Sequence, residues 1–221
     1  MFAELSATSN FTFLTGASHP EELMERAGLM GLDALAIADV NSVAGIVRAH
    51  QRGREIARAV AARRAAVAED GEIGPPAPDW AVRAPSLAVE NVPRLIPGAR
   101  IVLSCRLEAT ALPRDRAGWG RLCRLISKGR LRAEKGACLL HVDDLAEWGE
   151  GMELLLHPAS GAAWEAVARR LVKRFGAAVS LCAAPRYDGR DAVRLERLAA
   201  LAGRLGVPMV ASARPLMHHG S

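Results

Sequence analysis

The feature that most constrains the fold is a repeated alternation between short apolar runs and longer segments with helical periodicity. Residues 34–38 are continuously apolar and end at Asp39, which is typical of a parallel strand covered on both faces. Further strands are expected at 2–8, 101–105, 152–157, 178–182 and 207–211, with helices from Ser18, from about Ser42, and at 117–127, 164–175 and 191–205. Repeated strand–helix units predict a parallel sheet, either open and doubly wound or closed into a barrel. No Gly-x-Gly-x-x-Gly follows the first strand, which favours the barrel over a dinucleotide-binding fold.

One region interrupts this alternation. Six of the twelve prolines fall between residues 69 and 97, namely Pro75, Pro76, Pro78, Pro85, Pro93 and Pro97. Prolines at this density do not fit a core element, because each lacks a backbone donor. We therefore expect one domain over residues 1–221 that carries a Pro-rich surface insertion at 66–96.

The composition narrows the class of protein. Half of the 221 residues are hydrophobic but only 4% are aromatic, so a core must be built mostly from Ala, Leu and Val. No apolar run reaches the roughly 18 residues that a membrane span needs, and the N-terminus lacks a signal-peptide layout. The four cysteines stand far apart, which predicts buried thiols instead of a zinc site or a disulfide framework. We expect a cytoplasmic protein without a membrane partner.

Four stretches carry a family resemblance: AELSATSNFTFLTGASHPEEL (3–23), LDALAIADVNSVAGIVRAH (32–50), DRAGWGRLCRLISKGRLRAEKGACLL (115–140) and LERLAALAGRLGVPMVASARPLMHH (195–219). Together they resemble the N-terminal PHP (polymerase-and-histidinol-phosphatase) domain of the bacterial error-prone C-family DNA polymerases, paralogues of the polymerase III alpha subunit. The resemblance implies a distorted TIM-like (β/α)7 barrel of the PHP type. It also implies a site at the C-terminal ends of the strands, where such a barrel gathers its functional residues.

The resemblance further implies a metal site whose ligands are largely replaced here. Active PHP domains bind up to three divalent metals, which activate water for phosphoester hydrolysis. The His-x-His pair of the family corresponds to Ser6 and Thr8, and the Asp-His pair to Asp39 and Val40. A family glutamate corresponds to Arg100 and a late aspartate to Arg214, and arginine cannot act as a metal ligand. We expect a vestigial pocket without metal, cofactor or catalytic residue, formed by Ser6, Thr8, Asp39, Arg100, His157, Arg214 and His218.

Several residues of this pocket have alternative interpretations. We hypothesise that an arginine–Asp39 ion pair fills it, although Asp39 could instead cap the helix expected from about Ser42. His157 is either a hydrogen-bonded histidine at the rim of the barrel or a residual ligand, since a lone histidine seldom holds a metal. His218 and His219 are adjacent near the end of the chain, where an extended backbone would direct them to opposite sides.

A second candidate site is a basic stretch with helical periodicity. Eight positive charges lie within residues 114–135 against two negative ones, and the candidates for contact are Arg121, Arg124, Lys128, Arg130, Arg132 and Lys135. One interpretation is contact with the phosphate backbone of DNA, and another is docking against other polymerase domains. The third is a solvated helix face. Trp119 is the aromatic residue within the stretch, so base stacking is not favoured.

By resemblance, the parent protein would be a DNA-directed DNA polymerase of translesion synthesis and DNA repair. Its Mg²⁺ would be held by palm aspartates beyond Ser221, and its partners would include its own further domains, DNA, the sliding clamp and mutasome accessory proteins. The present chain would then be a metal-free structural or interaction module, inactive alone. The alternatives are an active metal-dependent phosphoesterase and a stand-alone interaction module. The end at His-His-Gly-Ser directly after a strand favours a fragment over the latter.

Overall fold

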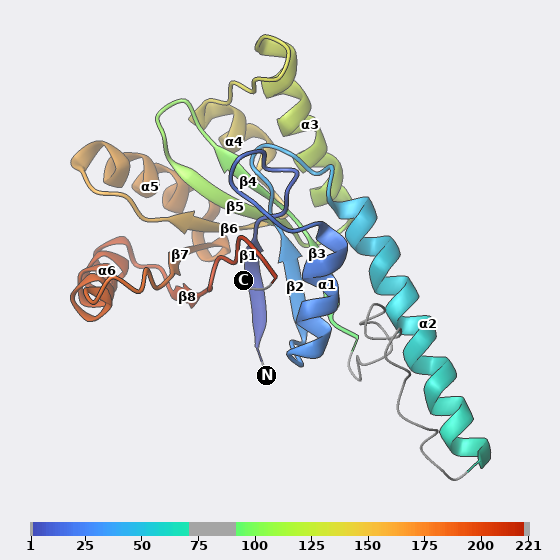
Figure 1. Ribbon diagram of the computed structural model, residues 1–221. Coiled ribbons are helices and arrows are strands. Elements are labelled where there is room, and N and C mark those ends of the chain that lie inside the picture. Colours follow the sequence, from blue (N-terminus) through green and yellow to red (C-terminus); the bar gives the residue numbers. More distant parts are fainter. Residues whose placement is uncertain (1, 71–91, 219–221) are drawn as a thin grey trace.

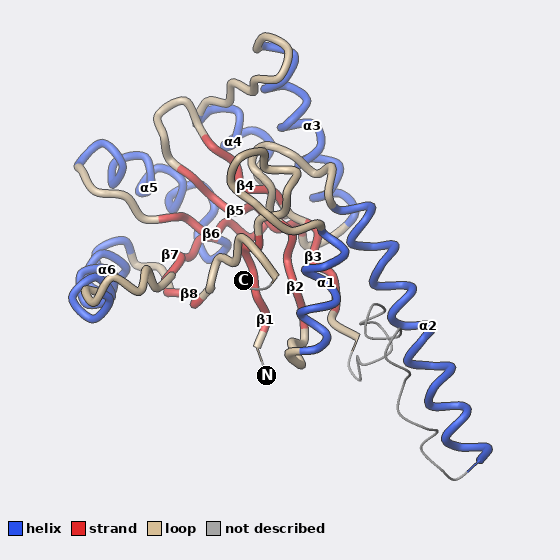
Figure 2. Tube along the Cα trace, in the orientation of Figure 1, coloured by secondary structure: helices blue, strands red, loops and turns tan. Residues whose placement is uncertain are grey.

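The computed structural model describes residues 2–70 and 92–218, with the side chains of 66–70 also outside the description. Figures 1 and 2 show a mixed α/β body in which helices surround the strands. The strands are β1 (Ala3–Ala7), β2 (Ala34–Ile37), β3 (Arg94–Pro97), β4 (Ala99–Val102), β5 (Glu108–Pro113), β6 (Met152–His157), β7 (Val179–Ala183) and β8 (Met209–Ala211). The helices are α1 (Pro20–Leu29), α2 (Ile46–Asp70), α3 (Arg116–Arg132), α4 (Val142–Trp148), α5 (Ala162–Phe175) and α6 (Asp191–Leu205), with a short 3-10 turn at Gly176–Ala178.

The strands form two sheets. The first has the order β1-β2-β3 and is parallel throughout, whereas the second has the order β4-β5-β6-β7-β8. In the second sheet β5 runs antiparallel to both of its neighbours, and β6, β7 and β8 are parallel to one another. The expected α/β class is confirmed, but the sheet is not wholly parallel.

Residues 94–102 connect the two sheets and keep the same pairing register with residues 34–40. Ala34 pairs with Arg94, Ile37 with Pro97, and beyond the end of β2 an isolated bridge pairs Val40 with Arg100. The offset between partners is the same in all three pairs, so residues 94–102 run beside 34–40 without a slip. The change of sheet falls at Gly98, where a Cβ atom would lie 2.7 Å from Leu112 Cδ2. Glycine fits here because the second sheet approaches closely, and a side chain at this position would displace the end of Leu112 and crowd Ala111 O at 3.1 Å.

The other meeting point of the two sheets, between β8 and β1, is closed by a buried carboxylate. No ladder joins these strands in the part of the chain that the structure describes, so the expected closed (β/α)7 barrel is not found. Instead Glu4 accepts hydrogen bonds from Ser212 Oγ (2.5 Å), Ala213 N (2.7 Å) and Ser6 N (2.8 Å). Thr8 N donates to Pro215 O at 3.0 Å. This seam brings the segment after β8 against the first strand.

Two apolar clusters form the core. The larger one lies between the second sheet and helices α3 to α6 and contains Ile101, Leu122 and Leu154, all fully buried. The smaller one lies between the first sheet and helices α1 and α2 and contains Met24 and Ile56. In Figure 1 these two helices lie along one side of the first sheet, and α2 extends well past it. Aliphatic residues dominate both clusters, as the low aromatic content predicts.

Several expected elements require correction. The helix expected from about Ser42 begins at Ile46. β5 and α4 were not expected, because β5 (EATALP) consists mainly of small residues and α4 is too short to show a period. The expected insertion at 66–96 is regular at both ends, since 66–70 belong to α2 and 94–96 belong to β3, and residues 71–91 lie outside the described part. No helix within the described ranges is long and apolar enough to cross a membrane.

The cysteines differ among themselves in exposure. Cys182 is buried, and burial raises the pKa of its thiol to about 11. Cys105 is exposed, whereas Cys123 and Cys138 are half-buried. The expectation of buried thiols is therefore confirmed for Cys182 and wrong for Cys105, which lies in the tight connection between β4 and β5.

The seam at Glu4 predicts a large effect of substitution there. Glu4→Ala would leave the buried Ser6 N–H and the donors at Ser212 and Ala213 without their acceptor, and should lower the free energy of unfolding by about 3 kcal/mol. Urea unfolding followed by circular dichroism measures this. The control is Glu196→Ala on the exposed face of α6, which should change the stability by less than about 0.5 kcal/mol. Equal effects of the two variants would contradict the role of Glu4.

Candidate functional site

The strand register brings four polar side chains to one face of the second sheet. Arg100 on β4 pairs with Thr110 on β5, and Glu108 on β5 pairs with His157 on β6. Residues 108 and 110 share a face because side chains alternate along a strand, and cross-strand partners lie on the same face as each other. Ser6 of β1 reaches the same place, since its Oγ shares a 2.9 Å hydrogen bond with Thr110 Oγ1. The face is therefore turned toward the first strand.

His157 lies at the buried end of this group. Its Nε2 shares a 2.8 Å hydrogen bond with Thr110 Oγ1, whereas its Nδ1 is buried without a hydrogen-bond partner. Burial first, and then the positive charges of Arg214 and Arg100, lower the pKa of His157 to about 3. The imidazole is consequently neutral at neutral pH.

Two arginines approach a single carboxylate. Arg100 Nε and Arg214 Nη2 each lie 3.9 Å from Glu108 Oε2. Arg100 is buried, its Nε lacks a hydrogen-bond partner, and burial lowers the pKa of its guanidinium although Glu108 acts against this shift. The sequence prediction missed Glu108, because it begins the strand that was not expected. We call Arg100, Arg214, Glu108 and His157 the arginine cluster.

Asp39 does not pair with either arginine. It is buried, and its carboxylate accepts hydrogen bonds from Ser9 N (2.9 Å), Ser9 Oγ (2.8 Å) and Thr12 Oγ1 (2.8 Å). The hypothesised arginine–Asp39 ion pair is wrong, since the salt bridges that the structure describes direct both guanidiniums to Glu108. The helix-cap alternative is also wrong, because the carboxylate holds the loop after β1 and α2 starts only at Ile46.

His218 lies apart from the arginine cluster, at the start of α1. Its Nδ1 shares a 2.7 Å hydrogen bond with Ser18 Oγ and lies 3.5 Å from Glu22 Oε2, and its backbone N also donates to Ser18 Oγ. The N-cap of α1 is His19, one residue later than the expected Ser18. His219 lies outside the described residues.

These residues do not fit a divalent metal. The described part of the chain contains no group of three or more His, Cys, Asp or Glu side chains placed to hold an ion. Both Asp39 oxygens accept hydrogen bonds, and Glu108 faces two guanidiniums. His157 Nδ1 is the ring nitrogen of this group that has no hydrogen-bond partner, and the positive charges of Arg214 and Arg100 act on the same histidine. These charges would repel a cation that bound there.

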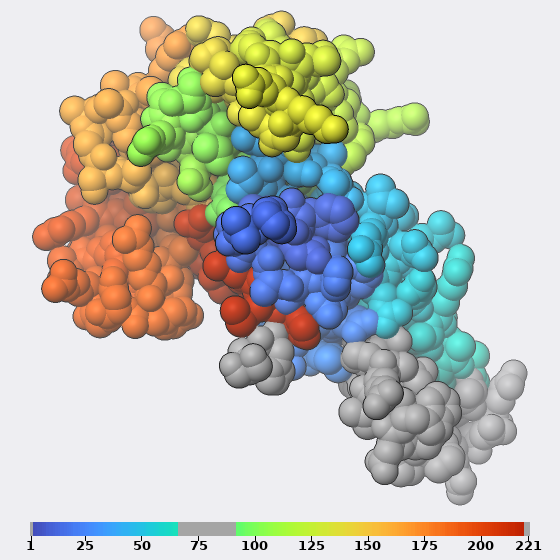
Figure 3. All heavy atoms as spheres, turned by 45° about the horizontal axis from the view of Figure 1, so that its top comes forward, coloured from blue at the N-terminus to red at the C-terminus, as the bar shows by residue number. Residues whose placement is uncertain are grey.

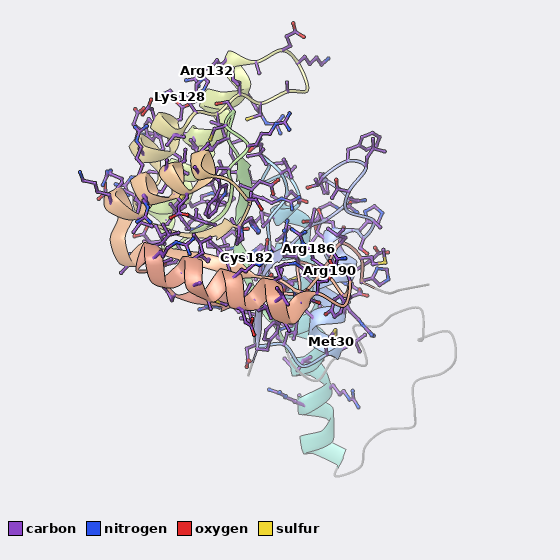
Figure 4. The ribbon with its side chains drawn as sticks, turned by 90° about the vertical axis from the view of Figure 1, so that its left-hand side faces the viewer. Met30, Lys128, Arg132, Cys182, Arg186 and Arg190 are labelled. Atoms are coloured by element: carbon purple, nitrogen blue, oxygen red, sulfur yellow. The ribbon has the colours of Figure 1, made fainter. Side chains whose placement is uncertain are left out.

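The basic stretch forms α3, and its charged side chains contact the rest of this chain. Arg132 binds Asp144 of α4 through both terminal nitrogens (2.6 and 3.0 Å), and Lys128 lies 3.1 Å from Asp144 and 2.7 Å from Glu147. Lys128 and Arg132 lie together at the end of the molecule opposite to Met30 (Figure 4). The Arg132 guanidinium is the main cause that holds the pKa of Asp144 well below its usual range.

Further basic residues of α3 are also engaged. Arg121 donates to Glu150 O (3.2 Å), Arg124 lies 5.6 Å from the ring centre of Trp148, and Arg130 donates to Asn41 O (3.0 Å). Lys135, which follows the helix, is exposed. The segment after α3 (yellow) shares a face with the loop after β1 (dark blue) in Figure 3. These contacts explain the position of the basic residues by intramolecular packing, and contact with DNA or another domain stays a prediction.

The ion pair between the buried Asp144 of α4 and the partly exposed Arg132 of α3 predicts a pH-dependent stabilisation. The folded state lowers the pKa of Asp144, so this contribution is complete above the unfolded value of about 4 and is lost as the pH falls toward the folded pKa. Asp144→Asn should cost about 2 kcal/mol at pH 7, since Asp144 is 3% exposed, and less below pH 4. Urea unfolding at both pH values measures this. Asp143→Asn, on the same helix but exposed, is the control, and a pH-independent loss at Asp144 would contradict the assignment.

The buried His157 also predicts that stability depends on pH, because its pKa is lower in the folded chain than in the unfolded chain. Between pH 6.5 and about 3 the unfolded chain binds a proton at this residue and the folded chain does not, so stability falls as the pH drops through this window. In a proton NMR titration the Hε1 resonance of His157 should stay in its neutral position down to about pH 4. A midpoint near 6.5 would contradict the buried, neutral assignment.

Comparison with known proteins relates the whole chain to one group. No family model matches it. The error-prone DNA polymerase of Ruegeria pomeroyi is 45% identical over 231 residues, which cover 100% of this chain and 20% of that protein. The error-prone DNA polymerases of Mesorhizobium japonicum and Rhodopseudomonas palustris are 39% and 36% identical, over 98% and 99% of this chain and 17% of each relative. The chain thus spans about a fifth of the length of these relatives.

Solved structures show the fold. A Bifidobacterium adolescentis protein, to which a metal-dependent phosphoesterase activity has been ascribed, superposes with a TM-score of 0.59 at 12% identity, over 97% of this chain and 87% of that one. An amidohydrolase from Chromobacterium violaceum, solved with sulfate and without metal, gives 0.53 at 14% identity, over the same shares of the two chains. The chain is therefore homologous, over its whole length, to a segment of the error-prone DNA polymerases, and its fold is similar to the folds of these two solved proteins.

Proposed function

We propose that this chain is the N-terminal PHP domain of an error-prone DNA polymerase, and that it serves there as a metal-free structural or interaction module. The homology of the whole chain to such polymerases supports the first part. The parent protein would synthesise DNA on a DNA template in translesion synthesis and repair, with Mg²⁺ held by palm carboxylates outside this chain. Its further polymerase domains, DNA, the sliding clamp and mutasome accessory proteins would be its partners in the cytoplasm.

The single observation that carries the second part is the arginine cluster. Arg100 and Arg214 occupy the two positions at which the family resemblance places metal-binding carboxylates, and both face Glu108. A guanidinium stays protonated throughout the physiological range and cannot donate an electron pair to a metal. The cluster thus replaces the charge of a metal with charge fixed on the protein.

A structural role is also consistent with how the domain is held together. Its stability comes from two apolar clusters, the Glu4 seam and the α3–α4 ion pairs, all supplied by the chain itself. Such a body can brace neighbouring domains without carrying out a reaction of its own.

The second candidate is an active metal-dependent phosphoesterase. The fold likeness to the Bifidobacterium adolescentis protein favours it, as do the retained Asp39 and His157. Two retained residues are fewer than the three protein ligands of a typical catalytic zinc site. Both Asp39 oxygens and His157 Nε2 already have hydrogen-bond partners, which leaves only His157 Nδ1 unpaired.

Metal analysis and a phosphodiesterase assay on the full-length protein separate the two. We expect less than stoichiometric Mn, Zn or Fe by mass spectrometry, and no chelator-sensitive hydrolysis of bis(p-nitrophenyl) phosphate. In the double variant Arg100→Glu/Arg214→Asp, which restores carboxylates at both positions, Mn²⁺ affinity should rise by at least about tenfold because two repulsive charges become attractive ones. Stoichiometric metal together with chelator-sensitive turnover in the unmodified protein would overturn the proposal.

A further inference from the structure

We propose that the arginine cluster is a binding site for a tetrahedral oxyanion, namely inorganic phosphate or the terminal phosphate of a phosphomonoester. The inference goes beyond the proposed structural role, and it rests on that role in one respect, that no metal occupies the pocket. The positive charge that attracts phosphate then comes from Arg100 and Arg214.

The first support is an unused donor. Arg100 is only 7% exposed, and its Nε has no hydrogen-bond partner. Buried polar groups in folded proteins are nearly always paired, so an unpaired guanidinium nitrogen at this depth indicates a missing acceptor. The planar fork of arginine matches the spacing of oxygens in a phosphate, which makes an oxyanion the natural acceptor.

The second support is the loose position of Glu108. Its Oε2 lies 3.9 Å from Arg100 Nε and 3.9 Å from Arg214 Nη2, beyond hydrogen-bond distance in both cases. The Glu108 side chain is 39% exposed, so it can turn toward solvent. A phosphate that enters between the guanidiniums would replace a distant carboxylate with direct, charge-assisted hydrogen bonds.

Arg214 is held in place for this contact. Its φ of 50° is uncommon for a residue with a side chain, and its backbone N donates to Ser212 Oγ at 3.2 Å. Ser212 Oγ in turn donates to the buried Glu4. The seam that joins β8 to β1 therefore fixes the backbone from which the second guanidinium reaches the cluster.

The floor of the site is neutral and offers a further donor. His157 is 5% exposed, and the charges of both arginines act on it. In the tautomer with the proton on Nδ1, Thr110 donates to Nε2 and the buried Nδ1–H is left without an acceptor in the chain, so we include it among the donors to the proposed anion. The other nearby anion, Asp39, is occupied by Ser9 and Thr12, so Glu108 is the acidic group that must move.

The depth of the site selects a terminal phosphate over a nucleic-acid backbone. Arg100 is more than nine-tenths buried, whereas the Arg214 side chain is 34% exposed. Arg100 Nε is closed to solvent beneath Glu108, so a ligand reaches it only once Glu108 has turned away. A terminal phosphate carries one ester chain and fits such a buried position, whereas a phosphodiester would have to bury a sugar on both sides. The ligand class is therefore a phosphate with three free oxygens.

Binding of inorganic phosphate to chelator-treated full-length protein tests the inference by isothermal titration calorimetry, with chloride at equal ionic strength as the reference. Arg214→Met, chosen because this partly exposed residue lies outside both apolar clusters, should weaken phosphate binding at least about tenfold. Glu108→Gln should tighten it by about fivefold, because a repulsive charge is removed. Arg94→Met, an exposed arginine at the start of β3, should leave it unchanged.

Two oligonucleotides that differ only in a 5′-phosphate separate the sources of the ligand. We expect the Arg214→Met and Glu108→Gln effects on the phosphorylated oligonucleotide alone. Effects of equal size on the 5′-hydroxyl form would overturn the assignment to a terminal phosphate. Absence of phosphate binding in metal-free protein, or binding that Arg214→Met leaves intact, would overturn the inference while the proposed function stands. Phosphate binding that appears only with stoichiometric metal would overturn both.

Discussion

A buried carboxylate, Glu4, holds the two ends of the described chain together, and the geometry of the candidate site depends on it. The first strand and the segment after the last strand share no ladder, yet three donors from both sides converge on this one side chain. Carboxylates accept such hydrogen bonds strongly when they are charged, which offsets the cost of burying the charge. Because Ser212 and Ala213 are fixed in this way, Arg214 leaves the backbone beside β5 and faces Glu108.

The charges of its side chains determine which kind of ligand the candidate site can hold. Register alone gathers Arg100, Glu108, Thr110 and His157 on one face, and any chain with this pairing would bring four side chains together there. Their chemistry then determines what the face can hold. Two guanidiniums and a neutral imidazole disfavour a cation, and the ligand proposed for this face is accordingly an anion.

Much of the fold was predictable from the sequence, because it depends on local pattern. The bounds expected for 152–157 and 191–205 coincide with those of β6 and α6, where apolar spacing is strong and the ends are marked by glycine or a charged residue. β5 was missed since its Glu, Ala and Pro residues carry little strand signal, and Glu108 was missed with it. The partners of Asp39 and of the α3 arginines come from other loops and from α4, and such contacts between separate segments leave no periodic trace in the sequence.

The central claim is that protein charge, not a metal ion, fills the pocket between β4, β5 and β6. Anomalous diffraction from crystals of the full-length protein grown with Mn²⁺, collected above and below the manganese edge, tests this most directly. The account predicts no anomalous peak within coordination distance of Asp39, Glu108 or His157, with the guanidiniums of Arg100 and Arg214 directed at Glu108 or at a bound oxyanion. A manganese peak coordinated by Asp39 and His157, with the arginines turned away, would contradict it.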